Sequence, residues 1–216
     1  MHFLREEDLF IDIGANIGSY TILASAEIGA KTIAVEPIPT TFKALEDNIQ
    51  INKLNSKVKA LNIGLSSTIG ILKFTKSMDS INHVATDTDT IDVNIDTLDN
   101  ILLSEISPII LKIDVEDFET QILLGAENTL KNNNLKAIII ELNGSGQRYG
   151  YDEMKIHQLL LDYGFKIYSY DPLTRKLDIA TKIGNLNTIY LRDFDFIENR
   201  VKSQRKISIG INNFTI

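Results

Sequence analysis

The chain has 216 residues, no cysteine, a 44% share of hydrophobic residues and a formal net charge of −7. This length suits a single α/β domain over residues 1–216 with a full apolar core. The lack of cysteine excludes a disulfide framework, a thiolate metal site and a cysteine nucleophile. The acidic balance argues against non-specific nucleic-acid binding, and no apolar run approaches the ~20 residues that cross a bilayer. The amino terminus lacks the features of a signal peptide, so we expect a cytoplasmic protein.

Apolar runs alternate with stretches of helical period, which is typical of a sheet with crossover helices. The predicted strands occupy residues 9–13, 32–36, 58–63, 109–115, 137–142, 165–170 and 188–191. The predicted helices occupy residues 19–28, 40–51, 118–131 and 153–163. Between the third and fourth strands we expect a hairpin around Gly70, a polar loop at 77–89 near the substrate, and a β-like stretch at 90–95. The pattern predicts a doubly wound, mostly parallel seven-stranded sheet with a β insertion before strand four.

The turn after the first predicted strand carries the first candidate ligand site, because ligands of doubly wound sheets bind outside the carboxyl ends of the strands. A dinucleotide site favours G-x-G-x-x-G, which brings a pyrophosphate close to the backbone. Here the glycines are Gly14 and Gly18, Asn16 stands in place of the middle glycine, and Asp12 would repel a pyrophosphate. An acid suits a ligand with positive ammonium and sulfonium groups. Glu36, at the end of the second strand, can accept both hydroxyls of a ribose.

With these motifs in hand, the chain resembles the FkbM family of S-adenosylmethionine-dependent methyltransferases. The matching segments are residues 10–18, 35–37, 94–99, 111–119, 124–126 and 140–142. The resemblance covers about residues 8–192 and implies a class I, Rossmann-like methyltransferase domain. Asp117 departs from the glycine usual in the family. About eight residues precede the first strand, fewer than is usual, so we expect the lid over the site to be shortened, truncated or supplied elsewhere.

The resemblance also implies roles for residues at the strand ends. Those expected around the methionine part of the cofactor are Asp12, Gly14, Asn16 and Gly18. Glu36 is expected at the ribose. Asn62 and Ile63, at the end of the third predicted strand, are candidates for contacts with the edge and the face of adenine. An equally favoured alternative is that these two residues only end the strand and cap the turn after it.

The catalytic candidates are Lys112, Asp114 and Glu116, which alternate at the end of the fourth predicted strand and so share a face until the chain turns. Transfer to a hydroxyl needs aligned reactants and removal of the hydroxyl proton, so a base beside the methyl group helps. Lys112 would hold the loop by ion pairing with the carboxylates, or would lower their pKa values and so weaken them as bases. A helix-capping role is the alternative for Glu116. Asp114 and Glu141 together are a less favoured candidate pair for a divalent cation, and no metal is assigned.

The expected function is O-methylation of a small-molecule or sugar hydroxyl by S-adenosylmethionine, with no nucleic-acid or membrane partner. Methylation of a nucleic-acid base is disfavoured, since no cysteine can attack a pyrimidine and no Asn/Asp-Pro-Pro-Tyr motif ends the fourth strand. Two alternatives remain open. One is a non-catalytic protein that binds S-adenosylmethionine, and the other is an NAD-type oxidoreductase.

Overall fold

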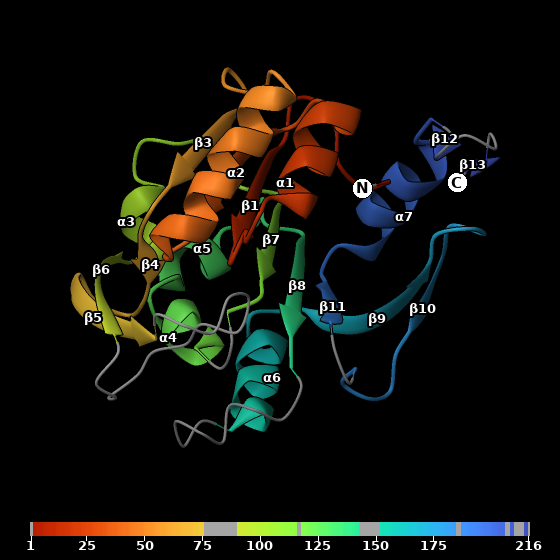
Figure 1. The fold of residues 1–216 in the computed structure, drawn as a ribbon. Helices are drawn as coiled ribbons and strands as arrows, with labels where there is room; N and C mark the ends of the chain where they lie inside the picture. The colour runs from red at the N-terminus through yellow and green to blue at the C-terminus, as the bar shows by residue number, and fades with distance from the viewer. Residues whose placement is uncertain are drawn as a thin grey trace.

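The computed structural model describes residues 2–75, 90–115, 118–142, 152–184, 187–205, 208–209 and 214–215. The strands of its main sheet are β1 (Leu9–Ile13), β2 (Lys31–Val35), β3 (Val58–Leu61), β7 (Ile110–Ile113), β8 (Ala137–Glu141), β9 (Lys166–Asp171), β10 (Lys176–Ile179) and β11 (Asn187–Leu191). They form an eight-stranded sheet in the order β10-β9-β11-β8-β7-β1-β2-β3 (Figure 1). Two short strands near the end of the chain, β12 (Ser208–Ile209) and β13 (Phe214–Thr215), pair separately.

The sheet is mostly parallel, as the sequence predicts. β1 pairs in parallel with both β2 and β7, and the parallel order continues to β3 on one side and β8 on the other. β11 runs antiparallel to β8 and β9, and β10 runs antiparallel to β9. The predicted count of seven strands is wrong, because β10 adds an eighth at the edge of the sheet. This strand is mostly exposed to solvent and therefore lacks the apolar pattern that marks the others.

Helices cover both faces of the sheet (Figure 1). Their bounds are Ser19–Ile22 for α1, Leu23–Ile28 for the π-helix η1, Pro39–Ile51 for α2, Leu98–Ile101 for α3, Glu119–Leu124 for α4, Glu127–Lys131 for α5, Glu153–Asp162 for α6 and Phe194–Ser203 for α7. Because strand side chains alternate between faces, Ile11 packs in one cluster with α3 to α6. Phe10 packs in another with η1 and α7, and Leu45 of α2 joins a third cluster. Among the described helices, none is long and apolar enough to cross a membrane.

Two predicted helices differ in detail from the observed ones. The helix predicted at 19–28 continues as a π-helix from Leu23. The helix predicted at 118–131 forms two helices, α4 and α5, that meet at Gly125 and Ala126. The backbone of Ser66 packs directly on Gly125, where a Cβ would lie 2.1 Å from the Ser66 carbonyl oxygen. The division of this helix therefore coincides with a tertiary contact.

A second, three-stranded sheet lies between β3 and β7 in the chain. Its strands are β4 (Gly64–Leu65), β5 (Gly70–Thr75) and β6 (Thr90–Asp96), in the order β4-β6-β5. The hairpin predicted around Gly70 is wrong, since β5 pairs antiparallel with β6 and β4 pairs parallel with β6. Phe74 and Val93 pack on Ile38, which brings this sheet to the end of β2. The polar loop predicted at 77–89 lies outside the described residues.

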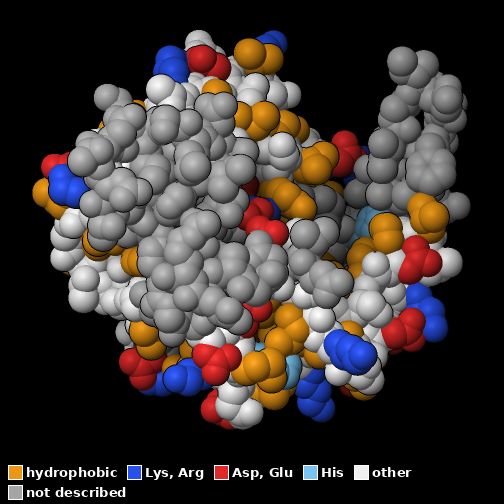
Figure 2. Space-filling view, turned by 60° about the horizontal axis from the view of Figure 1, so that its bottom comes forward, with side chains coloured by type: hydrophobic (Ala, Val, Ile, Leu, Met, Phe, Trp, Pro, Cys, Tyr) orange, Lys and Arg blue, Asp and Glu red, His pale blue; other side chains and the backbone are white. Residues whose placement is uncertain are grey.

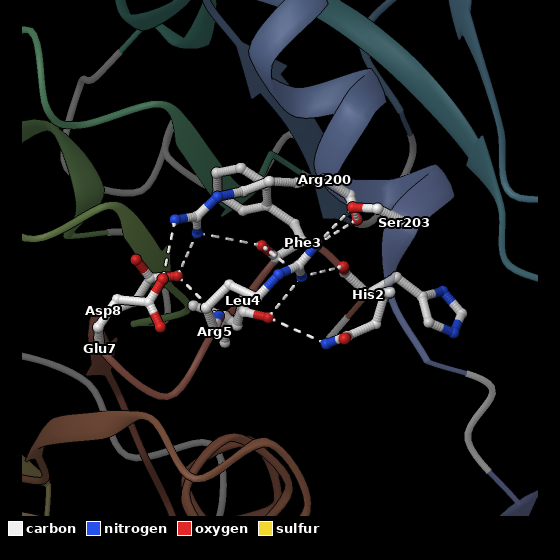
Figure 3. A network of polar contacts seen from close by, with 9 residues as sticks. His2, Phe3, Leu4, Arg5, Glu7, Asp8, Arg200 and Ser203 are labelled. Carbon is white, nitrogen blue, oxygen red and sulfur yellow. Dashed lines mark hydrogen bonds and ion pairs between the residues drawn. The ribbon is translucent and has the colours of Figure 1, made fainter.

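The residues before β1 are tied to α7 by a polar network (Figure 3). The Arg5 guanidinium donates to the carbonyl oxygens of His2 at 3.1 Å and Arg200 at 2.6 Å. Arg200 in turn forms ion pairs with Glu7 and with Asp8, and the Arg5 N–H donates to Asp8 at 2.7 Å. This network joins the amino end of β1 to the last described helix.

Candidate cofactor and catalytic site

A cavity of about 380 Å³ opens at the carboxyl ends of β1, β2 and β7. The chain order changes direction between β1 and β7, and such a switch point is where doubly wound sheets bind ligands. The volume falls within the ~300–1,000 Å³ of small-molecule and cofactor sites. Figure 2 views this end of the molecule and shows acidic side chains near its centre, beside hydrophobic ones. Of the predicted site residues, those on the cavity lining are Gly14, Asn16, Glu36, Ile63, Lys112 and Asp114.

The turn after β1 has an unusual backbone that its residues permit. Gly14, Asn16 and Gly18 have positive φ angles of 72°, 52° and 94°, a region that glycine and asparagine enter most readily. A Cβ on Gly14 would lie 1.8 Å from the Asp114 carbonyl oxygen, and one on Gly18 would lie 2.6 Å from Leu45. The two glycines thus let the turn pack against β7 and against α2.

All five backbone N–H groups of this turn donate hydrogen bonds within the protein. The bonds run from Gly14 and Ala15 to the Val35 carbonyl oxygen at 3.0 Å each, from Asn16 to Glu36 Oε2 at 3.0 Å, from Ile17 to Asn16 Oδ1 at 2.7 Å, and from Gly18 to the Ala15 carbonyl oxygen at 2.8 Å. A dinucleotide-binding turn instead directs its backbone donors at a pyrophosphate. The acceptors here are Val35 of β2, the Glu36 side chain directly after β2, and the turn itself, so this turn is not arranged to bind phosphate.

Glu36 lies at the end of β2 with its carboxylate between two backbone segments. Its Oε2 accepts from Asn16, and its Oε1 accepts from the Ile38 N–H at 2.9 Å. Burial raises the pKa of this carboxyl group, while the bonds from Ile38 and Asn16 oppose the shift. A carboxylate has about four acceptor positions, so roughly two remain for a ligand. The side-chain amide of Asn62 donates to the carbonyl oxygens of Glu36 and Pro37 at 2.9 and 3.0 Å, which places Asn62 behind this turn rather than on the cavity lining.

Asp12 lies beneath the cavity, not on its lining. It is 1% exposed, and its Oδ2 accepts a 2.6 Å hydrogen bond from the Thr21 hydroxyl of α1. Its Oδ1 lies 3.8 Å from the Lys112 ammonium. Burial raises the pKa of Asp12, and the Lys112 charge and the Thr21 bonds act in the opposite direction. The structure therefore brings Asp12 to Lys112 and Thr21.

Lys112 and Asp114 meet at the end of β7, as predicted from their spacing. The Lys112 ammonium donates to Asp114 Oδ2 at 3.0 Å and lies 4.9 Å from the centre of the Tyr20 ring. The Lys112 side chain is 3% exposed and that of Asp114 is 33% exposed, so a buried cation holds a carboxylate that solvent and ligands can reach. Glu116, the third catalytic candidate, lies outside the described residues.

Sequence reasoning missed Tyr20 and Thr21, which bring an aromatic ring and a hydroxyl to the Lys112–Asp12 pair. Both follow Gly18 in the first turn of α1, and only the packing of α1 on the sheet reveals which of its residues face β1 and β7. Glu141 ends β8 opposite Asn187 and does not line the cavity. Within the described ranges, no group of three or more histidine and acidic side chains forms a possible metal site.

The chain has a mostly parallel α/β sheet with a cavity at its switch point, and its fold is methyltransferase-like. The fold is similar to that of the methyltransferase FkbM from Methylobacillus flagellatus KT, with a TM-score of 0.61 and 13% identity over 87% of this chain and 44% of that one. Residues 12–167 match the methyltransferase FkbM domain. The chain therefore belongs to the FkbM methyltransferase family, which confirms the resemblance read from its motifs.

Two further relatives are methyltransferases. The chain is 29% identical over 200 residues to the hexuronic acid methyltransferase AglP of Haloferax volcanii, a match that covers 91% of this chain and 72% of that protein. It is 38% identical over 73 residues to the methyltransferase sdnD of Sordaria araneosa, which corresponds to 33% of this chain and 28% of that protein. The chain spans less than half of the Methylobacillus structure and about a quarter of sdnD.

Proposed function

We propose that residues 1–216 form one methyltransferase domain that uses S-adenosylmethionine and methylates a hydroxyl group of a small molecule or sugar. The observation that carries this proposal is the turn at residues 14–18, whose five backbone donors are all used within the protein. A cavity with such a turn and with two acids on its lining, Glu36 and Asp114, suits a cationic ligand better than a pyrophosphate.

The residues around the cavity divide among the parts of this cofactor. We assign the ribose hydroxyls to the remaining acceptor positions of Glu36, and the methionine part to the wall formed by Gly14 and Asn16. Gly18 closes the turn, and Asp12 acts on the methionine part from beneath the cavity, through its ion pair with Lys112. For adenine we assign the apolar wall that Ile63 forms with Ile38 and Phe74, while Asn62 keeps the Glu36–Pro37 turn in place.

The donor, when bound, supplies a methyl group already activated by the adjacent sulfonium, so the protein mainly aligns the reactants and accepts a proton. Asp114 is the proposed base, because its carboxylate lines the cavity and is one-third exposed. In the free protein, Lys112 holds that carboxylate in position. Glu116 follows Asp114 by two residues and is the second proposed acid at this strand end. No metal is assigned.

The proposed acceptor class draws on the Haloferax relative, which is named for methylation of a hexuronic acid. A hexuronic acid presents several hydroxyl groups and one carboxyl group, and for this chain we propose a hydroxyl of a glycan or of a small compound as the acceptor. Asp114 is the group that a hydroxyl acceptor needs within reach, because proton transfer requires a base at hydrogen-bond distance.

Ligand-induced stabilisation tests the cofactor assignment directly. S-adenosylhomocysteine should raise the melting temperature, since a ligand at 100 times its Kd adds about 2.7 kcal/mol to native stability. NAD should leave it unchanged. Glu36→Ala should abolish the response, and Glu46→Ala, on the exposed face of α2, should retain it. Stabilisation by NAD and not by S-adenosylhomocysteine would overturn the proposal.

Transfer of a labelled methyl group to a panel of neutral sugars, uronic acids and small hydroxyl compounds tests the reaction. Asp114→Asn should lower kcat by about 100-fold or more, the usual contribution of a positioned base. Binding of S-adenosylhomocysteine without transfer to any acceptor would favour the alternative of a non-catalytic binding protein.

A further inference from the structure

One ammonium group lies between two carboxylates and forms a hydrogen bond with one of them. Lys112 Nζ is 3.0 Å from Asp114 Oδ2 but 3.8 Å from Asp12 Oδ1, and the second distance is too long for a hydrogen bond. Among the described residues, Asp12 Oδ1 has no hydrogen-bond partner, although it is fully buried. A buried acceptor without a partner is costly, so this oxygen is an available second acceptor for Lys112.

The surroundings let the ammonium move and hold Asp12 still. Thr21 fixes the other oxygen of Asp12 at 2.6 Å. The backbone of Lys112 is held between β1 and β8, opposite Asp12 and Ile139. Only the end of the flexible lysine stem is left to shift, by less than 1 Å, along the face of the Tyr20 ring that it already contacts.

Within the described part of the chain, the groups near this pair come from its neighbouring elements. β1 contributes Asp12, the end of β7 contributes Asp114, and α1 contributes Tyr20 and Thr21. Glu36, at the end of β2, interacts with Asp12 through charge. On β8 the neighbour is Ile139, which carries no charge. Of the described acids, Asp12 and Asp114 form the ion pairs with Lys112, so the balance between them decides where the ammonium lies among these residues.

We propose that the Lys112 ammonium transfers its hydrogen bond from Asp114 to Asp12 Oδ1 when a cationic methyl donor enters the cavity. The inference rests on the proposed function, because it needs a donor that carries positive charge. Lys112 lines the same cavity as Asp114, so an incoming cation repels the ammonium and attracts the Asp114 carboxylate. Asp114 then loses its lysine partner as the donor binds and becomes free to accept a proton. Asp12 acts through Lys112, as a positioning residue.

Nuclear magnetic resonance of the lysine ammonium groups tests this transfer in the unmodified protein. With ¹⁵N-labelled lysine and ¹³C-labelled aspartate, couplings across the hydrogen bond identify the carboxylate that accepts from Lys112. The probes are S-adenosylhomocysteine, which lacks the sulfonium charge, and sinefungin, which carries an amine in that place. We expect coupling to Asp114 in the free protein, and a change of partner to Asp12 with sinefungin.

Failure of this inference and failure of the proposed function give different results. If both ligands bind and Lys112 keeps Asp114 as its partner, the transfer is wrong and the cofactor assignment stands. If neither ligand binds, the proposed function fails, and the transfer fails with it. If Lys112 changes its partner from Asp114 to Asp12 with sinefungin and not with S-adenosylhomocysteine, the result supports both the transfer and the proposed function.

A double-mutant cycle separates action through Lys112 from a direct effect of the Asp12 charge. Asp12→Asn should lower the affinity for sinefungin relative to S-adenosylhomocysteine by about tenfold, within the range of coupling between contacting residues. In a Lys112→Met background the same change should alter this ratio by less than about twofold, whereas an equal effect in both backgrounds would overturn the inference. Asp47→Asn, on the exposed face of α2, is the control. Should a cycle variant fail to fold, the resonance experiment on the unmodified protein decides.

Discussion

Replacing Glu36 by glutamine should be far from conservative. Both carboxylate oxygens accept a backbone N–H, one from Asn16 at 3.0 Å and one from Ile38 at 2.9 Å. A carboxamide offers one oxygen and one NH₂ group, so one of the two backbone donors must face another donor. An unpaired buried donor costs about 1–3 kcal/mol. Loss of a charged acceptor adds to this cost, and relief from burying that charge offsets part of it.

The expected net loss in the free energy of unfolding for Glu36→Gln is therefore about 1–3 kcal/mol. Urea denaturation at pH 7 measures it, and titration calorimetry with S-adenosylhomocysteine measures binding. Affinity should fall by at least about tenfold, since a neutral amide replaces a charge-assisted acceptor worth roughly 1.5–3 kcal/mol. Glu46→Gln, on the exposed face of α2, is the matched control and should change stability by less than about 0.5 kcal/mol.

A Glu36→Gln protein that unfolds like Glu46→Gln and binds S-adenosylhomocysteine normally would refute the reasoning. That result would mean that the two backbone donors find other partners at no cost, and that the ribose is bound elsewhere. Loss of stability with normal affinity would leave Glu36 as a support of the turn and remove it from the cofactor contacts.

Three more changes test other parts of the structure. Gly14→Ala should lower the free energy of unfolding by about 2–5 kcal/mol, from a strained positive φ and a clash with the Asp114 carbonyl oxygen. Gly164→Ala, also at positive φ but with nothing within 4 Å, measures the φ cost alone, about 1–2 kcal/mol, and thermal and urea unfolding compare the two variants. Burial raises the pKa of Asp12 in the folded state, so the stability that Asp12 contributes is present below its unfolded-state pKa of about 4 and is lost as the pH rises through its folded-state pKa. The stability of wild type relative to Asp12→Asn should therefore decrease between pH 4 and pH 7, and an increase would contradict this sign. Arg200→Ala should lower the free energy of unfolding by about 2–4 kcal/mol, because it leaves the buried Asp8 carboxylate without its arginine partner. The affinity for S-adenosylhomocysteine should not change, and Lys202→Ala on the exposed side of α7 is the control in both assays.

The features of the site that depend on short stretches of chain could be predicted from the sequence. Gly14 and Gly18 mark a turn because few other residues adopt the positive φ that it needs. Lys112 and Asp114 lie two residues apart in a strand, and this spacing alone places them on one face. These inferences depend only on local backbone conformation and on the alternation of side chains along a strand, and both can be predicted from short stretches of sequence.

The partners of Asp12 and Asn62 could not be predicted in the same way. Asp12 faces α1 and contacts Thr21, a contact set by how that helix packs on the sheet. Asn62 turns its amide toward the carbonyl oxygens of Glu36 and Pro37, which belong to a neighbouring strand end. By sequence pattern alone, a ligand and a backbone segment are equally good partners for a polar residue at a strand end, and the pairing of distant segments decides between them.

The same limit explains why the main evidence about the cofactor comes from the structure. The sequence of the turn at 14–18 suggests a ligand that is not a dinucleotide, but only the pairing with β2 shows where its backbone donors go. Val35 and Glu36 accept three of the five hydrogen bonds, and these acceptors lie twenty or twenty-one positions further along the chain than their donors. The acid that the motif assigns to the ribose is thus also the acceptor that completes the turn. If Glu36 binds the ribose as we propose, cofactor binding and local stability are coupled at this residue, and substitutions there should change the two together.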